Sequence, residues 1–345
     1  MNNQILTEDI QQFAETFELW KQLQGKTFLV TGATGLIGSI LIKCLLELNR
    51  QKNLAIKVVA VVRDLEKAKM VFEKDFSKIE FKQIVLADIS KDTIGTDIDY
   101  IIHLASPTAS KYFVDHPVET LRTSIEGTTV VLDYARIATI ESMVFASSLE
   151  VYGTNVDDNS IDESFQGYVN PLDVRSSYNI GKRAAESLCH AYCKEYKVPV
   201  KIARLTQTTG AGIAKDDNRI IAQFARLAAE GKDIILHTTG EAARPYCYTM
   251  DAISAILYIL FRGESGEAYN VANEETYISA KDMAEYLKKN VNSNICVKVE
   301  LKDSKGYAPT TKLRLNSGKI QALGWRPIYG MNEIIVRLTR SLKNG

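Results

Sequence analysis

The sequence lacks an excess of charge of either sign. Its 42 Lys and Arg residues are matched by 42 Asp and Glu residues, so the formal net charge is zero. Proteins that bind nucleic acids or acidic membrane surfaces usually carry a basic excess. The balance therefore favours neither a nucleic-acid partner nor a membrane partner.

Cysteine and histidine are scarce, with five cysteines and four histidines among 345 residues. No two cysteines form a CxxC pair; Cys189 and Cys193 lie four apart in a helical pattern, with His190 between them. A metal site would need further ligands nearby, so a structural role is the simpler interpretation and we expect no metal. An odd, scattered set of cysteines is typical of free thiols in a reducing cytoplasm.

Long apolar runs are also missing. No run reaches the length of a membrane span, and the N-terminus lacks the organisation of a signal peptide. Residues 4–24 instead show a helical pattern, with Ile10, Phe13 and Trp20 at helical spacing. We therefore expect a soluble, cytoplasmic protein that begins with a helical extension over residues 1–24.

Short apolar strands alternate with helices in the first half of the chain. Strands buried on both faces of a parallel sheet have this apolar character, and the intervening helices cover the two faces. The sequence therefore predicts an α/β fold with a Rossmann-type doubly wound parallel sheet. The predicted strands cover residues 26–32, 57–63, 81–88, 99–106 and 142–148.

The alternation loosens after about residue 150. A polar loop over 153–174 precedes a helix at about 175–196 and a strand over 200–205. Short strands and helices continue to the end without repeats or a Pro/Gly-rich linker. This pattern predicts a smaller α/β domain, mainly over 206–345, that is interleaved with a first domain over 25–205.

A glycine-rich turn follows the first predicted strand and leads directly into a helix. Glycines at these spacings permit a tight turn and let the backbone approach a pyrophosphate, whose charge the helix N-terminus stabilises. The strand–turn–helix context predicts an NAD or NADP site rather than a plain turn, and it makes the first domain the dinucleotide-binding one. The residues expected to hold the dinucleotide here are Gly32, Thr34, Gly35, Leu36, Ile37 and Gly38.

The end of the second predicted strand bears on the choice of cofactor. Arg63 there suits the 2′-phosphate of NADP and slightly favours that cofactor, with a solvated surface arginine as the alternative. A shift of one residue would instead make Asp64 a ligand of the NAD ribose. Asp88, which ends the third predicted strand and precedes Ile89, is a candidate for the adenine amine; a helix or turn cap is its alternative role.

Tyr178 and Lys182 lie four residues apart in a helical pattern, which puts them on one helix face. A lysine ammonium, aided by a positive nicotinamide, lowers the phenol pKa from its ordinary value of about 10. The phenol can then remove a proton from an alcohol as hydride leaves the carbon, or donate it in reduction. The pair therefore predicts hydride-transfer chemistry.

Ser148 and Glu150 are further candidates for the same site. Ser148 ends the fifth predicted strand, where its hydroxyl can bond the reacting oxygen, and Ser147 competes for this role. Glu150 can act as an acid or base on a second carbon; a loop cap or a solvent-facing charge is the alternative.

Together these motifs resemble the NAD(P)-dependent sugar epimerase/dehydratase family, within the extended short-chain dehydrogenases. The similarity runs from about residue 25 to the C-terminus. In that family the nicotinamide oxidises C4 of a nucleotide sugar, and the 4-keto sugar is then epimerised, dehydrated or decarboxylated. The motifs are TGATGLIG (31–38), HLAS (103–106), SSLEVYG (147–153), Tyr178-x-x-x-Lys182 and NSGKIQALGW (316–325).

Within the family, residues 167–183 and the run containing Glu150 are similar to UDP-glucuronate decarboxylases. The resemblance implies a nucleotide-sugar substrate bound mainly by the second domain, and a homodimer formed by the helices at about 117–138 and 175–196. It also implies that Arg244 contacts the nucleotide diphosphate. The further residues implied are Leu104, Ala105, Ser106 and Lys182 for the cofactor and Gln207 and Arg219 for the substrate.

The chain departs from the family pattern at several positions. Leu149 stands where 4,6-dehydratases carry an acid and decarboxylases usually a serine, and leucine cannot donate a proton. Gln207 and Ser124 each replace a common asparagine. Arg63 differs from the acidic residue usual in the NAD-retaining enzymes, and the N-terminal helix is not part of the family core.

Three functions are compatible with this pattern. The first is a redox-neutral enzyme such as a UDP-glucuronate decarboxylase or a 4-epimerase, supported by Glu150 and residues 167–183. The second is an NADPH-consuming ketoreductase of a nucleotide-linked sugar or polyol precursor, supported by Arg63 and Leu149. The third is a non-enzymatic NADP(H) sensor, against which the presence of Tyr178 counts.

Overall fold

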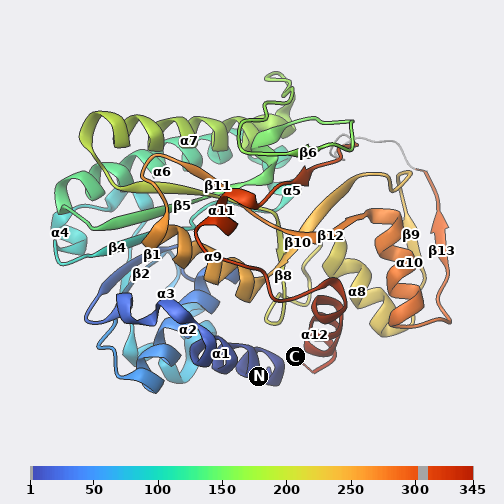
Figure 1. Ribbon diagram of the computed structural model, residues 1–345, viewed down its shortest axis with the longest axis horizontal. Helices are drawn as coiled ribbons and strands as arrows, with labels where there is room; N and C mark the ends of the chain where they lie inside the picture. Colours follow the sequence, from blue (N-terminus) through green and yellow to red (C-terminus); the bar gives the residue numbers. More distant parts are fainter. Residues whose placement is uncertain (1–2, 302–309, 345) are drawn as a thin grey trace.

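A seven-stranded parallel sheet forms the centre of the molecule (Figure 1). The computed structural model describes residues 3–301 and 310–344. The strand order is β11-β7-β5-β4-β1-β2-β3, so the chain winds outward from β1 in both directions. This arrangement confirms the predicted α/β class and the Rossmann-type doubly wound sheet. The strands are β1 (Thr27–Thr31), β2 (Lys57–Val62), β3 (Glu80–Gln83), β4 (Tyr100–His103), β5 (Ser142–Ser148), β7 (Val200–Leu205) and β11 (Ala268–Val271).

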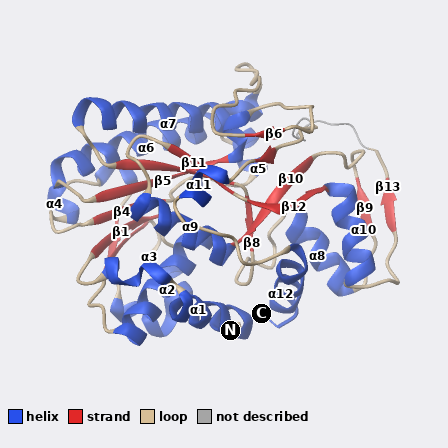
Figure 2. Ribbon diagram, viewed as in Figure 1, coloured by secondary structure: helices blue, strands red, loops and turns tan. Residues whose placement is uncertain are grey.

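Helices cover both faces of this sheet (Figure 2). Successive side chains of a strand point to opposite faces, and in β1 Phe28 and Val30 join one core cluster while Leu29 joins the other. The cluster around Leu29 contains residues of α6 (Pro117–Ala138) and α7 (Ser177–Tyr196). The opposite cluster contains residues of α2 (Leu36–Lys52) and α9 (Thr249–Arg262).

The third strand is shorter than predicted, which corrects the placement of Asp88. β3 is the outermost strand and pairs only with β2, so nothing on its other side extends the ladder. It ends at Gln83, and a short 3-10 helix, η3 (Leu86–Asp88), follows. Asp88 is therefore an exposed residue of that turn and not the end of a strand.

The second half of the chain builds a smaller lobe and also contributes to the large sheet. β11 forms one edge of the large sheet and α9 packs against it, although both follow residue 205. The lobe holds a three-stranded sheet that the sequence pattern did not indicate: β8 (Gln207–Thr209), β10 (Ala243–Tyr248) and β12 (Asn273–Ser279). Its other elements are α8 (Ile220–Glu230), β9 (Ile234–Leu236), α10 (Ala280–Asn290), β13 (Val297–Val299) and α12 (Met331–Asn344).

Several short elements connect these layers. The predicted polar loop contains a two-residue strand, β6, which pairs with β14. The short elements are α3 (Leu65–Phe72), α4 (Lys91–Ile94), α5 (Ser110–Asp115), β6 (Ser160–Ile161), β14 (Arg314–Leu315), α11 (Gly318–Ala322) and the 3-10 helices η1 (Glu18–Leu23), η2 (Glu73–Lys78), η4 (Leu149–Tyr152) and η5 (Val174–Ser176).

The N-terminal helix α1 (Gln4–Thr16) lies beside α2 and α12, so the two ends of the chain meet (Figure 1). Phe13 and Leu23 of the N-terminal segment are buried in the core cluster beside α2. The predicted extension is therefore helical and packs on the body of the protein. Within residues 3–301 and 310–344, no helix has both the length and the apolar character needed to cross a membrane.

Candidate functional site

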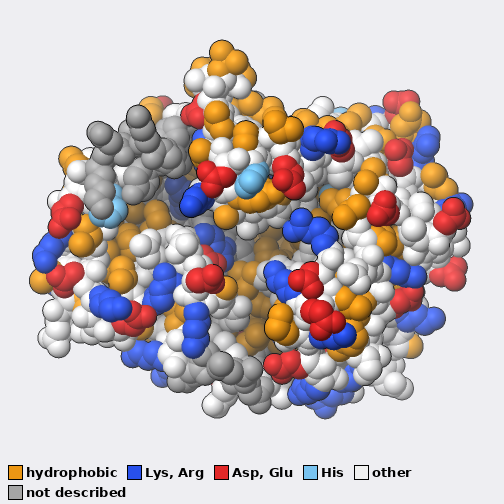
Figure 3. Space-filling model, turned by 180° about the vertical axis from the view of Figure 1, so that it is seen from behind, with side chains coloured by type: hydrophobic (Ala, Val, Ile, Leu, Met, Phe, Trp, Pro, Cys, Tyr) orange, Lys and Arg blue, Asp and Glu red, His pale blue; other side chains and the backbone are white. Residues whose placement is uncertain are grey.

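A cavity of about 2530 Å³ extends from the glycine turn after β1 to the loop after β8. Its wall contains backbone from the first βα turn, side chains of β5 and α7, and residues of α1 and α5. Figure 3 shows that one face of the molecule is hollowed in the middle, with hydrophobic side chains inside and Lys and Arg side chains around the rim. Both the predicted cofactor turn and the predicted catalytic pair belong to this one cavity.

The glycine turn is tight because its glycines touch other backbone. Gly32 has a φ of +69°, and a Cβ there would lie 2.7 Å from the carbonyl carbon of Leu104. A Cβ at Gly38 would lie 2.4 Å from the carbonyl oxygen of Gly32. Side chains at these two positions would therefore push apart β1, α2 and the loop after β4.

The start of α2 is suited to an anion. Gly35 is its N-cap residue and offers no side-chain hydrogen bond to the first turn. The amides of the first helical turn have no partners within the helix, and Leu36, Ile37 and Gly38 line the cavity together with Thr34. These free amides, and the lack of side chains at the glycines of the turn, fit the pyrophosphate of a dinucleotide.

At the end of the cavity near α3, Arg63 and Asp64 have different surroundings. Arg63 lines the cavity, and so does Lys67 of α3. The carboxylate of Asp64 instead accepts a hydrogen bond from the Lys67 amide, 2.9 Å away, and caps α3. Asp64 is therefore engaged as a helix cap, and positive side chains border this end of the cavity.

The loop after β4 lies where the resemblance implied. Leu104, Ala105 and Ser106 all line the cavity, and the Ala105 amide donates to the Thr31 hydroxyl at 3.3 Å. Asp88 and Ile89 do not line the cavity; Leu86 and Ala87 occupy the wall in their place. The shift follows from the early end of β3.

Tyr178 and Lys182 lie on the cavity side of α7 and are both buried. The Lys182 Nζ is 5.9 Å from the centre of the Tyr178 ring and donates to the backbone oxygen of Ala146 in β5 at 2.7 Å. Burial lowers the pKa of Lys182 to about 8. This contact brings the helix that carries the phenol against the strand that carries Ser148.

The environment of Tyr178 keeps its phenol protonated in the protein alone. Burial and the nearby Glu150 carboxylate raise its pKa above the ordinary value, whereas a hydrogen bond from Ser148 and the charge of Arg175 act in the opposite direction. Its ring is stacked on Phe113 of α5, with 4.2 Å between the ring centres. A lowered phenol pKa therefore requires an additional positive charge in the cavity.

The two adjacent serines have different partners. The Ser147 hydroxyl donates to the Glu186 carboxylate of α7 at 2.5 Å. The Ser148 hydroxyl accepts the Glu150 amide at 3.2 Å and bonds Tyr178. The geometry therefore favours Ser148 over Ser147 as a partner of the reacting oxygen.

Glu150 is held at the cavity wall by an ion pair. Arg175 Nη2 lies 2.9 Å and 2.8 Å from the two carboxylate oxygens of Glu150. Asn179 donates to the backbone oxygen of Glu150 at 2.7 Å. The Arg175 Nε is buried with no hydrogen-bond partner in the structure. Glu150 is thus neither a loop cap nor a solvated charge.

Leu149 explains one departure from the family pattern. Its side chain is buried in a small hydrophobic cluster that includes Val151, Tyr152 and Ile161. Leu149 also lines the cavity, and its apolar side chain has no proton to donate there.

The predicted substrate residues are not all in one place. Gln207 of β8 and Arg219 line the cavity. Arg219 pairs with Asp217 at 2.6 Å, and its Nη1 donates to the Thr208 backbone oxygen at 2.6 Å. Arg244 lies on β10 opposite Ile278 and does not line the cavity.

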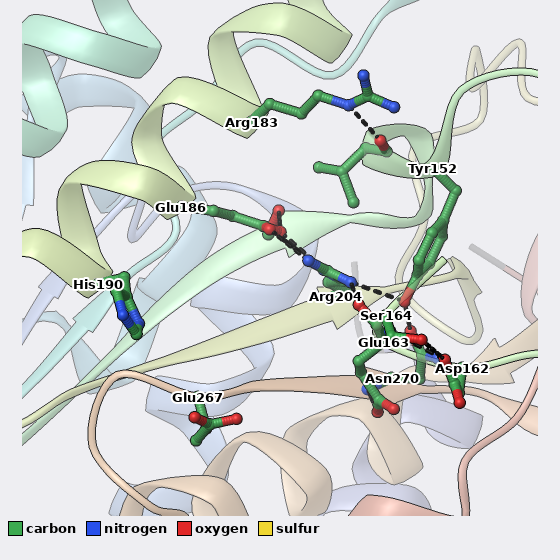
Figure 4. A network of polar contacts seen from close by, with 12 residues as sticks. Tyr152, Asp162, Glu163, Ser164, Arg183, Glu186, His190, Arg204, Glu267 and Asn270 are labelled. Atoms are coloured by element: carbon green, nitrogen blue, oxygen red, sulfur yellow. Dashed lines mark hydrogen bonds and ion pairs between the residues drawn. The ribbon is translucent and has the colours of Figure 1, made fainter. Parts of the chain in front are cut away.

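A buried polar network joins α7 to the sheet (Figure 4). Glu186 of α7 forms an ion pair with Arg204 of β7 at 2.7 Å, and both side chains are buried. Arg204 also donates to the Tyr152 hydroxyl at 2.9 Å, and Tyr152 donates to Asn270 at 2.6 Å. The network therefore joins α7, β7 and β11 to η4, the turn that contains Glu150.

Metal-binding groups are not part of this site. In the portion of the chain that the structure describes, no three His, Cys, Asp or Glu side chains are placed to hold a metal ion. Cys189 is buried, Cys193 is partly buried, and all five cysteines are free.

Several residues of the site carried no clear signal in the sequence. Phe113 lies 65 positions before Tyr178, and no local pattern relates them. Arg204 lies in a strand and Glu186 in a helix, and the sequence pattern around each gives no sign that they pair. Arg175 lies three positions before Tyr178, and that spacing was the one usable sign of its proximity.

Comparison with known proteins agrees with this geometry. Residues 28–272 match the model described as the NAD dependent epimerase/dehydratase family. The chain is 28% identical over 305 residues to UDP-glucuronic acid decarboxylase 3 of Arabidopsis thaliana, covering 88% of this chain and 85% of that protein. It is 26% identical over 323 residues to UDP-glucuronic acid decarboxylase 1 of Danio rerio, covering 92% and 74%.

Solved structures share the fold. UDP-glucose 4-epimerase of Thermotoga maritima superposes with a TM-score of 0.78 at 20% identity, covering 92% of this chain and 98% of that one. UDP-glucuronic acid 4-epimerase of Bacillus cereus, solved with NAD, superposes with a TM-score of 0.74 at 22% identity, covering 92% and 96%. At these identities the likeness establishes the fold alone.

The network behind α7 makes a prediction about stability. Arg204→Leu leaves the Glu186 carboxylate buried without its partner, which should lower the free energy of unfolding by about 3–5 kcal/mol. The exposed pair of Arg122 and Glu126 on α6 provides the control, and Arg122→Leu should cost about 0–1 kcal/mol. Denaturant unfolding of both variants measures the difference. Equal losses for the two variants would contradict a buried, uncompensated charge.

Proposed function

The chain belongs to the NAD dependent epimerase/dehydratase family of enzymes, and we propose that it modifies a nucleotide sugar through oxidation at C4. The observation that carries this proposal is that the glycine turn, Tyr178, Lys182 and Ser148 line a single cavity. Among the reactions of the family, we favour decarboxylation of a UDP-glucuronate-like substrate. The similarity to UDP-glucuronic acid decarboxylases over most of the chain supports this choice.

The first step concerns the proton on the C4 hydroxyl. Tyr178 accepts this proton through its phenol oxygen, and Ser148 holds the same substrate oxygen with the hydroxyl that bonds Tyr178. A bound NAD or NADP supplies the hydride acceptor and a positive nicotinamide charge. Lys182 keeps the helix in register through Ala146 and contributes its own charge beside the phenol.

The cofactor would be held by the first βα turn and the loop after β4. The amides of Leu36, Ile37 and Gly38 would bond the pyrophosphate, and Gly32 allows the loop at Leu104 to pack closely against the turn. Stacking of Phe113 on Tyr178 fixes the orientation of the phenol ring and helps to exclude water from the reacting oxygen.

The second step is assigned to Glu150. Oxidation at C4 turns a uronic acid into a β-keto acid, which loses its carboxylate as carbon dioxide and then needs a proton on the carbon left behind. The C4 ketone would finally take back the hydride, with the proton from Tyr178, so that no cofactor is consumed. Glu150 lines the cavity two residues after Ser148, where an acid can deliver that proton. Arg175 fixes the carboxylate by bonding both of its oxygens.

A second candidate function rests on Arg63 and Leu149. Arg63 and Lys67 border the cofactor end with positive charge, while Asp64 is engaged as a cap. We therefore propose a preference for NADP over NAD, which suits an NADPH-consuming ketoreductase of a nucleotide-linked sugar or polyol precursor. The apolar setting of Leu149 counts against 4,6-dehydration of the usual kind.

Three further expectations stay proposals. The part up to about residue 205 is assigned mainly to the dinucleotide and the remainder mainly to the nucleotide sugar, with Gln207, Arg219 and Arg244 as its ligands.

We also propose a homodimer formed through α6 and α7, whose outer surfaces expose apolar side chains such as Ile137 and Tyr196. A cytoplasmic location is proposed from the reducing conditions that free thiols favour.

The proposed reaction predicts a defined product. With NAD or NADP and a panel of UDP-, CDP-, GDP- and dTDP-linked sugars, mass spectrometry should detect loss of carbon dioxide from UDP-glucuronate without net consumption of cofactor. Tyr178→Phe should reduce turnover by about 100-fold or more while cofactor binding is retained. Tyr196→Phe, at the exposed end of the same helix, should have no effect.

Two outcomes would redirect this assignment. In a parallel assay with added NADPH, its stoichiometric consumption would identify the ketoreductase instead. Binding of NADP(H) that is indifferent to Tyr178→Phe, with no turnover of any sugar in the panel, would identify a sensor.

The role of Glu150 predicts a separation of the two steps. Glu150→Gln keeps the hydrogen-bonding shape but cannot release a proton, so oxidation should continue while product formation falls about 100-fold or more. Reduced nicotinamide should then accumulate, which its absorbance measures. Glu230→Gln, an exposed change on α8, provides the control. Equal loss of oxidation and product formation would contradict the assignment.

The cofactor preference predicts an asymmetric effect at Arg63. Arg63→Ala should weaken NADP binding by about 10- to 100-fold, because a charge-assisted bond to the 2′-phosphate contributes roughly 1.5–3 kcal/mol. The same change should have little effect on the binding of NAD. Arg136 lies on the outer side of α6 away from the cavity, so the control variant Arg136→Ala should bind NADP as the unaltered protein does. Titration calorimetry measures all three; equal affinities for NADP before and after the change would overturn the preference.

A further inference from the structure

The two ends of the chain meet beside the substrate end of the cavity. α1 precedes the segment that matches the family model, and α12 follows it. Figure 1 shows α1 and α12 next to each other. Residues Leu6, Thr7 and Ile10 of α1 line the same cavity as Gln207 and Arg219, so this helix forms part of the wall.

A buried carboxylate connects the two ends to the body of the protein. Asp9 of α1 is 0% exposed and accepts hydrogen bonds from the Tyr248 hydroxyl and from Arg337 of α12, the latter at 2.6 Å. Burial raises the pKa of Asp9, and the bonds from Tyr248 and Arg337 oppose that effect. A buried carboxylate is costly unless it is paired and hydrogen-bonded, so the three side chains depend on one another.

The same groups contact the loop that follows β8. The Tyr248 hydroxyl accepts the Ala211 amide at 3.4 Å. The Ser341 hydroxyl of α12 accepts the Gly212 amide at 3.3 Å and the Asn3 side-chain amide at 2.6 Å. The turn at 211–212 is therefore bonded to both ends of the chain through two side-chain hydroxyls.

Gly212 shows that the loop is fitted to α1. Its φ is +88°, a conformation that other residues rarely adopt. A Cβ at this position would lie 3.0 Å from Leu6 Cδ2 and 3.5 Å from Ile40 Cδ1. The loop therefore approaches α1 as closely as its backbone permits.

The position of this loop matters for the substrate end. Gln207 lies just before it, and the loop ends at Arg219, whose side chain bonds the Thr208 backbone oxygen. A displacement at 211–212 would move the backbone that sets the spacing between Gln207 and Arg219. The glycine turn and Tyr178 lie on other elements and would not move with it.

We propose that α1 and α12 act as a latch that positions the substrate end of the cavity. Tyr248 and Ser341 contact the loop after β8, and Asp9 holds the Tyr248 hydroxyl. The latch deepens the proposed function, on which its substrate-binding part rests. These are positioning residues: they act on nucleotide-sugar binding and not on the bond-making steps. We expect them to affect the binding of the nucleoside diphosphate part of the substrate.

Tyr248→Phe tests the latch, because it removes the bonds to Asp9 and Ala211 while keeping the ring. We expect UDP to bind about 5- to 10-fold more weakly and KM for UDP-glucuronate to rise by a similar factor, with kcat and NADP affinity within about two-fold. Ser341→Ala, which removes the second hydroxyl, should act in the same direction and serves if Tyr248→Phe folds poorly.

Tyr258→Phe is the matched control. Tyr258 of α9 donates to Glu18 of the N-terminal segment at 3.1 Å, so its loss weakens a bond of the same kind away from the loop. It should lower the thermal stability without changing UDP binding or KM. If the latch served stability alone, Tyr248→Phe and Tyr258→Phe would both lower the thermal stability, and neither would change KM.

Hydrogen exchange separates failure of the latch from failure of the proposed function. Amides of residues 207–219 should exchange faster in Tyr248→Phe than in Tyr258→Phe, whatever the substrate is. Unchanged exchange in this loop overturns the latch, and so does faster exchange with unchanged UDP affinity. If the unaltered protein binds NADP but no UDP, the proposed substrate is wrong and the exchange result alone decides the latch.

Discussion

The hydrogen bond from the Lys182 ammonium to the Ala146 carbonyl is the contact on which the site depends. It joins α7 to the end of β5 and thereby brings Tyr178 beside Ser148. Because the ammonium is buried, its pKa is lowered to about 8, and its charge acts in a poorly screened environment. One buried cation therefore joins a helix to the sheet and lies beside the phenol of Tyr178.

Paired charges at the start of α7 and along its sheet-facing side stabilise this arrangement. Glu150 is held by Arg175 at the cavity, and Glu186 is held by Arg204 between α7 and the sheet. Each pair joins α7, or the turn leading into it, to a separate element, so the helix cannot rotate without leaving a charge unpaired. Such fixed positions suit a site in which one phenol must address one sugar carbon.

The substrate end is built differently from the cofactor end. The cofactor turn is defined by backbone alone, since Gly32 and Gly38 leave no room for side chains. The loop after β8 is instead held by side chains from distant parts of the chain, Tyr248 and Ser341.

The sequence by itself determined the alternating α/β order, the glycine turn and the Tyr178–Lys182 pair, because each of these signals lies within one strand or one helical turn. Tertiary structure alone decided that β3 ends at Gln83, as its outer edge has no partner strand. It also decided the stacking of Phe113 on the phenol and the burial of Asp9 between the chain ends. Such contacts join residues far apart in the chain, and their energies depend on burial that no local pattern records.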